Sequence, residues 1–269
     1  MVIVYALLLV IVGVWIYGFF KSNDLKVPPL NYSSFKNVLV IFPHPDDETL
    51  SSGGLIRSLT NQGSNVTIVV LTKGEKGNDD AHVDTSLKRV REKELHKACE
   101  SLGVSTIVLE DFGDGELTRQ KDKLKKYINS TISKYNPDLI ITYDLSGLYG
   151  HADHIVTSEI ITDFVMTKYQ HISLLYPSLP SKILSMITLP EHMAKNPEFK
   201  LKRVTPTHRV LIGINITHRI RALYAYRSQL YSFKKSFPIK WIPLWFYYSM
   251  QLFEYYHWPI PRDPSDVLQ

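Results

Sequence analysis

The chain has 269 residues, 44% of them hydrophobic, and is therefore long and apolar enough to bury a full core. Its formal net charge of +5 is modest and its basic residues are scattered, which argues against a nucleic-acid-binding protein. Cys99 is the single cysteine, so the chain forms no intramolecular disulfide, as suits a domain in a reducing compartment.

The N-terminal segment Val2 to Phe20 carries no charged side chain and has the length, roughly 20 residues, that a helix needs to cross a bilayer. A cleaved signal peptide would need a basic start and a small-residue cleavage site, and this segment has neither. We therefore predict a membrane anchor at 2–20 and a linker at 21–35. Lys21 and Lys26 follow the anchor, so the positive-inside rule places the rest of the chain in the cytosol. A lumenal body remains open, because four N-x-S/T sequons are present, at Asn31, Asn65, Asn129 and Asn215.

Short apolar runs then alternate with longer amphipathic ones, a pattern typical of α/β folds. Strands are predicted at Asn37–Phe42, Asn65–Leu71, Thr106–Leu109, Asp138–Tyr143 and Arg209–Ile214. Helices are predicted at about 48–62, 85–102, 117–135, 153–168 and 217–233, the first two ending at the cap glycines Gly63 and Gly103. Near-continuous apolar strands joined by helices predict a Rossmann-like, mostly parallel sheet with helices on both faces, in one domain at 36–235.

The last segment, 236–269, is rich in aromatic side chains and is preceded by lysines. Such a density is typical of a membrane interface, so we predict a lipid-contacting appendage. An aromatic subdomain packed on the core is the open alternative. The aromatic residues in question are Trp241, Trp245, Phe246, Tyr247, Tyr248, Tyr255, Tyr256 and Trp258.

The stretch "FPHPDDETL" lies directly after the first predicted strand of the domain. One interpretation is a helix start, because Pro45 suits the first helical position and the acidic residues after it suit the first turn. The helix-start interpretation does not explain the presence of His44. In parallel sheets ligands bind outside the carboxyl ends of the strands, and His44 lies at such an end.

A second polar cluster, "HADH" from His151 to His154, follows the strand at 138–143 and its glycine-containing loop. Both clusters therefore lie at carboxyl ends of strands in one sheet, where the fold brings the loops together. Two histidines and a carboxylate opposite another histidine and two aspartates supply the imidazole and oxygen ligands that a catalytic zinc ion takes. We predict a metal site between the two clusters.

Several motifs in consistent order resemble the LmbE-like, or PIG-L, family of zinc-dependent sugar de-N-acetylases. These motifs are "PHPDDE", "TKGEKG", "RxxEL", "DGEL" and "YGHADH", and they cover about residues 36 to 235. With its anchor and the motif "YRSQL", the chain is most similar to the branch that acts on N-acetylglucosaminyl-phosphatidylinositol. That reaction is the second step of glycosylphosphatidylinositol anchor synthesis, on the cytosolic face of the endoplasmic reticulum.

The resemblance implies a division of roles among the site residues. It implies His44, Asp47 and His154 as ligands of Zn²⁺, although iron, manganese or cobalt suits the same ligands. It implies Asp46 as general base and His151 as the group that polarises the amide carbonyl. Asp153 would orient an imidazole. Substrate contacts are implied for Arg91, Asp114 and Tyr149, although an ordinary salt bridge and an ordinary turn would also explain the first two.

The chemistry of a metal site does not identify the substrate. An anchored enzyme suits a lipid-linked glycan presented at the bilayer, which predicts the phosphatidylinositol-linked substrate and contact with the membrane. Two alternatives remain open: a zinc de-N-acetylase of another N-acetyl sugar conjugate, and a noncatalytic membrane-anchored binding module.

Overall fold

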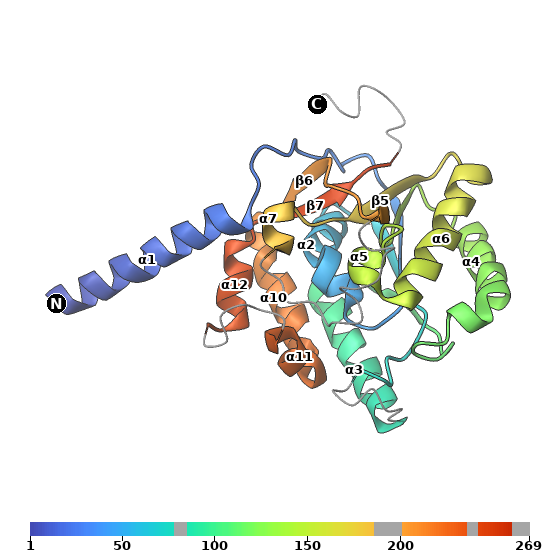
Figure 1. Ribbon diagram of the computed structural model, residues 1–269, viewed down its shortest axis with the longest axis horizontal. Coiled ribbons are helices and arrows are strands. Elements are labelled where there is room, and N and C mark those ends of the chain that lie inside the picture. The colour runs from blue at the N-terminus through green and yellow to red at the C-terminus, as the bar shows by residue number, and fades with distance from the viewer. Residues whose placement is uncertain (78–84, 186–200, 236–241, 260–269) are drawn as a thin grey trace.

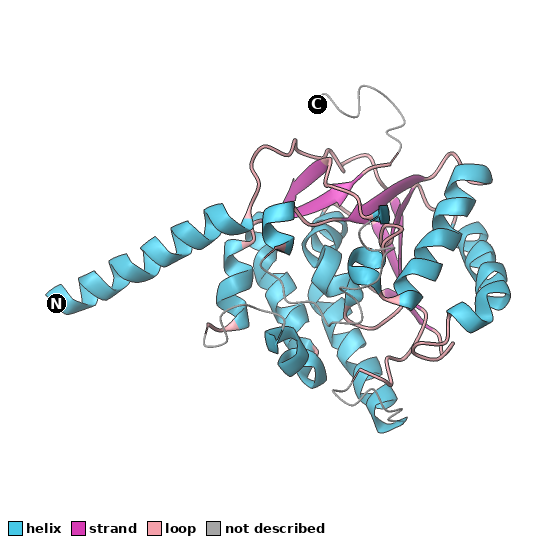
Figure 2. Cartoon of the chain, in the orientation of Figure 1, coloured by secondary structure: helices cyan, strands magenta, loops and turns pink. Residues whose placement is uncertain are grey.

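The computed structural model describes residues 1–77, 85–185, 201–235 and 242–259. A seven-stranded sheet in the order β3-β2-β1-β4-β5-β7-β6 runs through it (Figures 1 and 2). The strands β3 to β5 in that order are parallel, and β7 is antiparallel to both of its neighbours. The predicted mostly parallel sheet is thus confirmed. The strands are β1 (Asn37–Phe42), β2 (Asn65–Val70), β3 (Thr106–Leu109), β4 (Leu139–Ile141), β5 (Ser173–Pro177), β6 (His208–Leu211) and β7 (Phe253–His257).

Helices cover both faces of the sheet because alternate residues of each parallel strand point to opposite sides. In β1, Val38, Val40 and Phe42 pack toward α2, α3 and α10, whereas Leu39 and Ile41 pack toward α4 and α6. The helices of the described part are α1 (Val2–Ser22), α2 (Asp47–Asn61), α3 (Thr85–Leu102), α4 (Lys121–Tyr135), α5 (Gly147–Gly150), α6 (Ala152–Thr167), α7 (Ser181–Leu184), α10 (Ile216–Ala225), α11 (Leu230–Lys235) and α12 (Leu244–Met250). Single turns of 3₁₀ helix lie at Thr118–Gln120 (η1), Gly213–Asn215 (η2) and Arg227–Gln229 (η3).

The sheet order places a crevice at the carboxyl ends of β1 and β4. The chain adds β2 and β3 on one side of β1, then returns to place β4 and β5 on the other side. In open α/β sheets the ligand site lies where the strand order reverses in this way. The loops after β1 and β4 therefore meet at this point.

The segment 236–269 departs from its predicted place outside the domain. Its residues Phe253–His257 form β7, an internal strand of the same sheet, so position 235 does not separate two units. Tyr255, Tyr256 and Trp258 are buried. Of the aromatic residues named above, Trp241 lies outside the described residues. The strands β5 and β7 were not predicted, and the second is an aromatic run that resembles an interfacial segment.

Helix α2 is bound at its middle by a side chain from β7. Glu254 accepts hydrogen bonds from the backbone N–H groups of Gly54 (2.7 Å) and Leu55 (2.8 Å). Arg219 of α10 donates to the carbonyl of Leu50 and lies 3.3 Å from the Glu254 carboxylate. A side chain at Gly54 would collide with Ile212, so only glycine allows this close packing. The buried ion pair thereby fixes α2, whose first turn carries the acidic cluster.

Replacing Glu254 by alanine is expected to lower the free energy of unfolding by about 3–5 kcal/mol, because it leaves the buried Arg219 without its partner. Urea denaturation of the full chain in detergent micelles measures this. Asp163→Ala is the control: it breaks the 3.2 Å ion pair with Lys125, in which both side chains are about half exposed. The control should cost less than about 1 kcal/mol. Equal losses in the two variants would contradict the role given to Glu254.

The N-terminal helix α1 projects away from the domain (Figure 1). Among the described residues it is the helix long and apolar enough to span a membrane, with a mean hydropathy of 2.6. Its C-terminal end packs on α12, where Trp15 donates a hydrogen bond to Ser249 (3.1 Å). Asn23, just beyond the helix, donates to the carbonyl of Met250 (2.7 Å). The helix is therefore attached to the domain through α12.

Candidate active site

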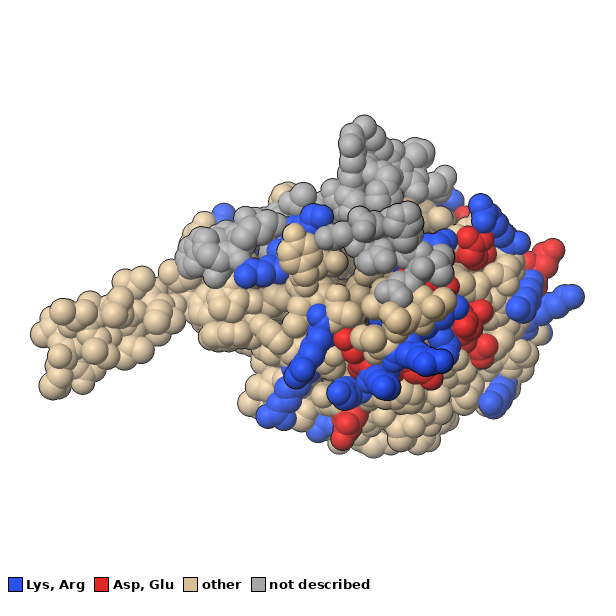
Figure 3. All heavy atoms as spheres, turned by 90° about the horizontal axis from the view of Figure 1, so that it is seen from below, with Lys and Arg blue, Asp and Glu red and all other residues tan. Residues whose placement is uncertain are grey.

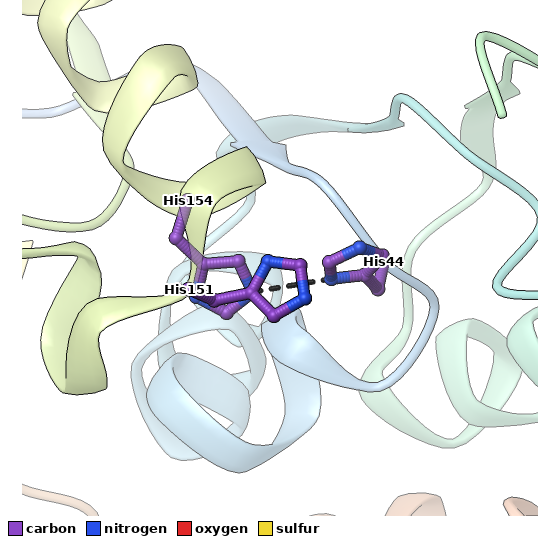
Figure 4. Close-up of side chains that lie close together, drawn as sticks. All are labelled: His44, His151 and His154. Carbon is purple, nitrogen blue, oxygen red and sulfur yellow. Dashed lines mark hydrogen bonds between the residues drawn. The ribbon is translucent and has the colours of Figure 1, made fainter. Parts of the chain in front are cut away.

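The two polar clusters singled out in the sequence meet at the crevice between β1 and β4. His44 follows β1, and His151 and His154 come from the start of α6 (Figure 4). The three imidazoles point toward one another, and the Nδ1 atom of His44 lies 3.1 Å from the Nε2 atom of His154. His44 is 7% exposed and His154 is fully buried, whereas His151 is half-buried.

One carboxylate oxygen completes a triangle with two of these nitrogen atoms. The Oδ2 atom of Asp47 lies 3.5 Å from the Nδ1 atom of His44 and 3.5 Å from the Nε2 atom of His154. A tetrahedral zinc ion with bonds of about 2.0–2.1 Å holds its ligand atoms about 3.3 Å apart. The spacing of these three atoms therefore fits a metal ion at the centre of the triangle.

The other nitrogen of His44 faces two carboxylates. Its Nε2 atom lies 3.1 Å from Asp114 and 3.2 Å from Asp153. His44, Asp114 and Asp153 could themselves hold a metal, as could the three histidines together. We favour the triangle with Asp47, because Asp153 is already bound by the backbone N–H groups of Gly115 and Leu117. These two carboxylates are thus placed to accept the Nε2 proton of His44 and to fix its orientation.

Further hydrogen bonds orient Asp47 and His154. The hydroxyl group of Tyr143 donates to the Oδ1 atom of Asp47 (2.8 Å), and its ring stacks on His154. The Nδ1 atom of His154 lies 3.1 Å from the carbonyl oxygen of Gly147, so the proton sits on Nδ1 and leaves Nε2 free as an acceptor. Each of the three side chains of the triangle is therefore oriented by a contact with a group outside it.

Electrostatics prepare Asp47 and His154 as ligands, whereas His44 would have to release its Nδ1 proton in order to bind a metal. Burial would raise the pKa of Asp47, but the charges of His154 and His44 hold it below its usual range, so the carboxylate is ionised. Burial lowers the pKa of His154 to about 3, so its imidazole is neutral at neutral pH. Burial also opposes protonation of His44, but hydrogen bonds to Asp114 and Asp153 raise its pKa well above its usual value.

Asp46 directly precedes Asp47 in the chain and is 8% exposed. It caps α2 with a φ angle of 107°, a left-handed conformation that is strained for a residue other than glycine. Its Oδ2 atom accepts a hydrogen bond from Arg91 (2.7 Å), which also donates to the carbonyl of Pro45. Burial raises the pKa of Asp46 to about 8, although the charge of Arg91 opposes the shift. The helix begins at Asp47, so Pro45 does not occupy the first helical position.

His151 caps the N-terminus of α6. Its Nδ1 atom accepts a hydrogen bond from the backbone N–H of Asp153 (3.2 Å), which leaves the proton of the neutral ring on Nε2. Burial lowers the pKa of His151 to about 4. The side chain thus offers one N–H donor next to His44 and His154, whose ring centroids lie 4.8 and 4.9 Å away.

The three residues implied as substrate contacts lie at the same crevice. Arg91 is 3% exposed and forms a buried ion pair with Asp46, in place of the solvated pair that its charged helix suggested. Asp114 lies against His44. The Tyr149 hydroxyl is 3.5 Å from the Nε2 atom of His154. Each is thus engaged with the proposed catalytic groups, and contact with substrate stays a prediction.

Sequence reasoning missed Tyr143 as a support of the site, and it did not find the distant partner of Glu48. Tyr143 ends a predicted strand at the carboxyl edge, and its position there could have marked it. Glu48, in the first turn of α2, is fully buried and accepts hydrogen bonds from Tyr226 (2.6 Å) and from the backbone N–H of Asp46 (3.1 Å). The Tyr226 contact has no local sequence signal, because 178 positions separate the two residues.

Over part of its length the chain is similar to known deacetylases. Residues 39–165 match the family described as "PIG-L: GlcNAc-PI de-N-acetylase". A probable N-acetyl-alpha-D-glucosaminyl L-malate deacetylase 2 of Bacillus anthracis is 33% identical over 137 residues, which cover 49% of this chain and 60% of the relative. The chain thus matches only about half to three-fifths of the length of its curated relatives.

Solved structures share the fold. N,N'-diacetylchitobiose deacetylase from Pyrococcus horikoshii has a TM-score of 0.54 at 23% identity, covering 78% of this chain and 75% of that one. GalB, a 4-carboxy-2-hydroxymuconate hydratase from Pseudomonas putida, has a TM-score of 0.62 at 18% identity, covering 85% and 98%. Because these structures bear names of different reactions, the fold alone does not identify the chemistry. The sequence comparison is more specific, because residues 39–165 are similar to the PIG-L family of de-N-acetylases.

Proposed function

We propose that the protein hydrolyses the acetamide group of an N-acetylglucosaminyl conjugate in a metal-dependent reaction. The observation that carries this proposal is the triangle of His44, Asp47 and His154, with the buried carboxylate of Asp46 beside it. The family match to de-N-acetylases supports the same reaction. A noncatalytic binding module would need neither Asp46 nor His151 at this position.

His44, Asp47 and His154 would hold the metal through Nδ1, Oδ2 and Nε2 respectively. Three protein ligands are the number that catalytic zinc sites use, which leaves a position open for water or substrate. Zinc bound there would supply a Lewis acid that lowers the pKa of water and polarises a carbonyl group. Asp153 and Asp114 fix the ring of His44 from the opposite side.

Asp46 would act as the general base and then as the general acid. A carboxyl group whose pKa burial raises to about 8 can take a proton from water and return it to the leaving amine near neutral pH. Arg91 holds the carboxylate in place through the 2.7 Å hydrogen bond to Oδ2. The neighbouring Asp47 keeps a low pKa and stays ionised, so the two aspartates have separate tasks.

His151 would stabilise the oxyanion that forms when water adds to the acetamide carbonyl. Its neutral ring carries the proton on Nε2, because Nδ1 accepts from the backbone of Asp153. A donor that is already oriented toward the developing negative charge accelerates the step without reorganisation. Tyr149, whose hydroxyl lies beside His154, is placed to contact the same group.

For the conjugate, we propose N-acetylglucosaminyl-phosphatidylinositol. The support is α1, an apolar helix with no buried residue and a mean hydropathy of 2.6, which would anchor the enzyme in the membrane that holds a lipid-linked substrate. The proposal includes a cytosolic catalytic domain at the endoplasmic reticulum. Soluble N-acetylglucosaminyl conjugates are the second candidate, because the Bacillus anthracis relative is named for one.

Acetate release from both substrate classes tests the proposal. Membranes containing the full chain should release acetate from N-acetylglucosaminyl-phosphatidylinositol, and a zinc chelator should abolish the release. The matched substrate is the water-soluble N-acetylglucosaminyl-inositol conjugate without the lipid. Activity on the soluble conjugate alone would replace the first substrate by the second candidate. Chelator-resistant activity would contradict the metal, and absence of activity on any N-acetylglucosaminyl conjugate would contradict the reaction itself.

A further inference from the structure

A surface groove of about 410 Å³ lies between α3 and α10, away from the crevice. Lys93, Glu94 and Lys97 line it from α3, and their spacing of one helical turn puts them on one side of that helix. Arg91, which points into the active site, is not among its lining residues. The groove is thus separate from the proposed catalytic site. Its polar and aromatic lining consists of Lys93, Glu94, Lys97, Arg221, Tyr224 and Arg227.

The groove concentrates positive charge. Its four basic side chains are exposed, and none has an ion pair or hydrogen bond with a residue in the described ranges. Glu94 is the one acidic residue of the lining, and its two oxygens accept hydrogen bonds from the backbone and hydroxyl of Ser228 (2.9 and 2.7 Å). The formal charge of the lining is therefore +3, and the basic groups are available to a ligand. Figure 3 shows Lys and Arg side chains together with Asp and Glu side chains on the face of the domain seen from below.

The groove is connected to the apolar helix through two packed helices. Tyr224 of α10 accepts a hydrogen bond from the backbone N–H of Trp245 (3.3 Å) at the start of α12. Trp245 is 50% exposed, and α12 packs against α1 through Trp15 and Ser249. Figure 1 shows α1, α12, α10 and α3 in this succession. Proteins that contact membrane surfaces commonly place an exposed tryptophan between an apolar helix and basic side chains, as is found here.

We propose that this groove binds the phosphate-bearing headgroup of an anionic lipid in the membrane that holds α1. Charge complementarity supports a phosphate ligand, because four unpaired cations surround a hollow large enough for a headgroup. The lipid origin rests on the membrane insertion proposed above for α1. Binding would draw α3 and α10 toward the bilayer and so set the orientation of the domain relative to its surface. The groove itself takes no part in catalysis.

Amine-reactive footprinting of the full chain in lipid nanodiscs tests the proposal. The acylation rates of Lys93 and Lys97 are measured by mass spectrometry in phosphatidylcholine nanodiscs with and without phosphatidylinositol. We expect the anionic lipid to slow both rates about fivefold, the factor that corresponds to about 1 kcal/mol per basic residue. Lys126 and Lys134, exposed on α4, should not respond. Lys26, which follows α1, is the reference residue. The change in its acylation rate gives the general effect of a negatively charged membrane surface.

A pair of matched double variants identifies the site. Arg221→Gln/Arg227→Gln should reduce the protection of Lys93 and Lys97 to the level at Lys26. Lys126→Gln/Lys134→Gln removes the same charge and should leave that protection intact.

Three outcomes would overturn the proposal. Protection at Lys93 and Lys97 no greater than at Lys26 would show a general surface effect. Protection in neutral nanodiscs on addition of inositol 1-phosphate would make a soluble phosphate the ligand. A chain that does not enter nanodiscs would overturn the anchoring of α1 together with this inference. Because no readout depends on turnover, these outcomes are independent of whether acetate is released in the activity assay.

Discussion

Replacing Asp46 by asparagine is expected to lower the rate of acetate release about 10²- to 10⁴-fold and to leave the metal bound. Asparagine keeps the shape and the hydrogen bond from Arg91, but it cannot take a proton from water. The metal triangle is left intact, because Asp46 contributes no atom to it. Steady-state kinetics and elemental analysis of the same purified sample measure the two quantities.

Asp111→Asn is the control for this experiment. Asp111 also pairs with a basic residue of α3, Lys88 (2.6 Å), but it lies on the surface. Its replacement should change neither turnover nor metal content. Full activity of the Asp46 variant would exclude Asp46 as the base, and loss of its metal would show that the residue acts as a ligand.

The Asp47→Asn variant is expected to lose both the metal and the activity. Its Oδ2 atom lies 3.5 Å from the ring nitrogens of His44 and His154, so an amide there removes the negatively charged corner of the triangle. The loss of affinity should exceed the roughly 10- to 100-fold that removal of a group orienting a ligand costs. Zinc content after dialysis against a series of chelator concentrations measures it.

Asp153→Asn provides the graded comparison. Asp153 contacts His44 at 3.2 Å but lies outside the triangle, so its replacement should weaken metal binding less than replacement of Asp47. Excess zinc should restore activity to the Asp153 variant before it does so to the Asp47 variant. The reverse order would favour the alternative group of His44, Asp114 and Asp153 as the metal site.

Local patterns in the sequence predicted the elements that carry the site. The apolar run at Asn37–Phe42 forms β1 with the expected bounds, and Thr106–Leu109 and Thr85–Leu102 also match. Gly63 and Gly103 adopt the positive φ angles expected of helix caps. Because parallel strands bring their carboxyl ends to one edge, two short clusters were sufficient to locate the crevice.

Contacts between distant segments could not be predicted. Arg91 was implied as a substrate contact, with an ordinary salt bridge as the alternative, and its buried pair depends on the loop that carries Asp46, 45 positions away. The strand β7 has the composition of an interfacial segment, and its place is set by pairing with β5 and β6. Aromatic residues pack equally well against a protein core or a bilayer, so composition does not distinguish the two.

The contact of Glu254 with α2 also has a consequence for how the protein is made. Gly54 and Glu254 lie 200 positions apart, so the helix that begins at Asp47 emerges from the ribosome long before the side chain that binds its middle. Contacts of such long sequence separation form late and slowly in folding. During synthesis, α1 and the first strands would thus exist before α2 is fixed. We expect the nascent chain to acquire its metal only after β7 has joined the sheet, so that incomplete chains are inactive.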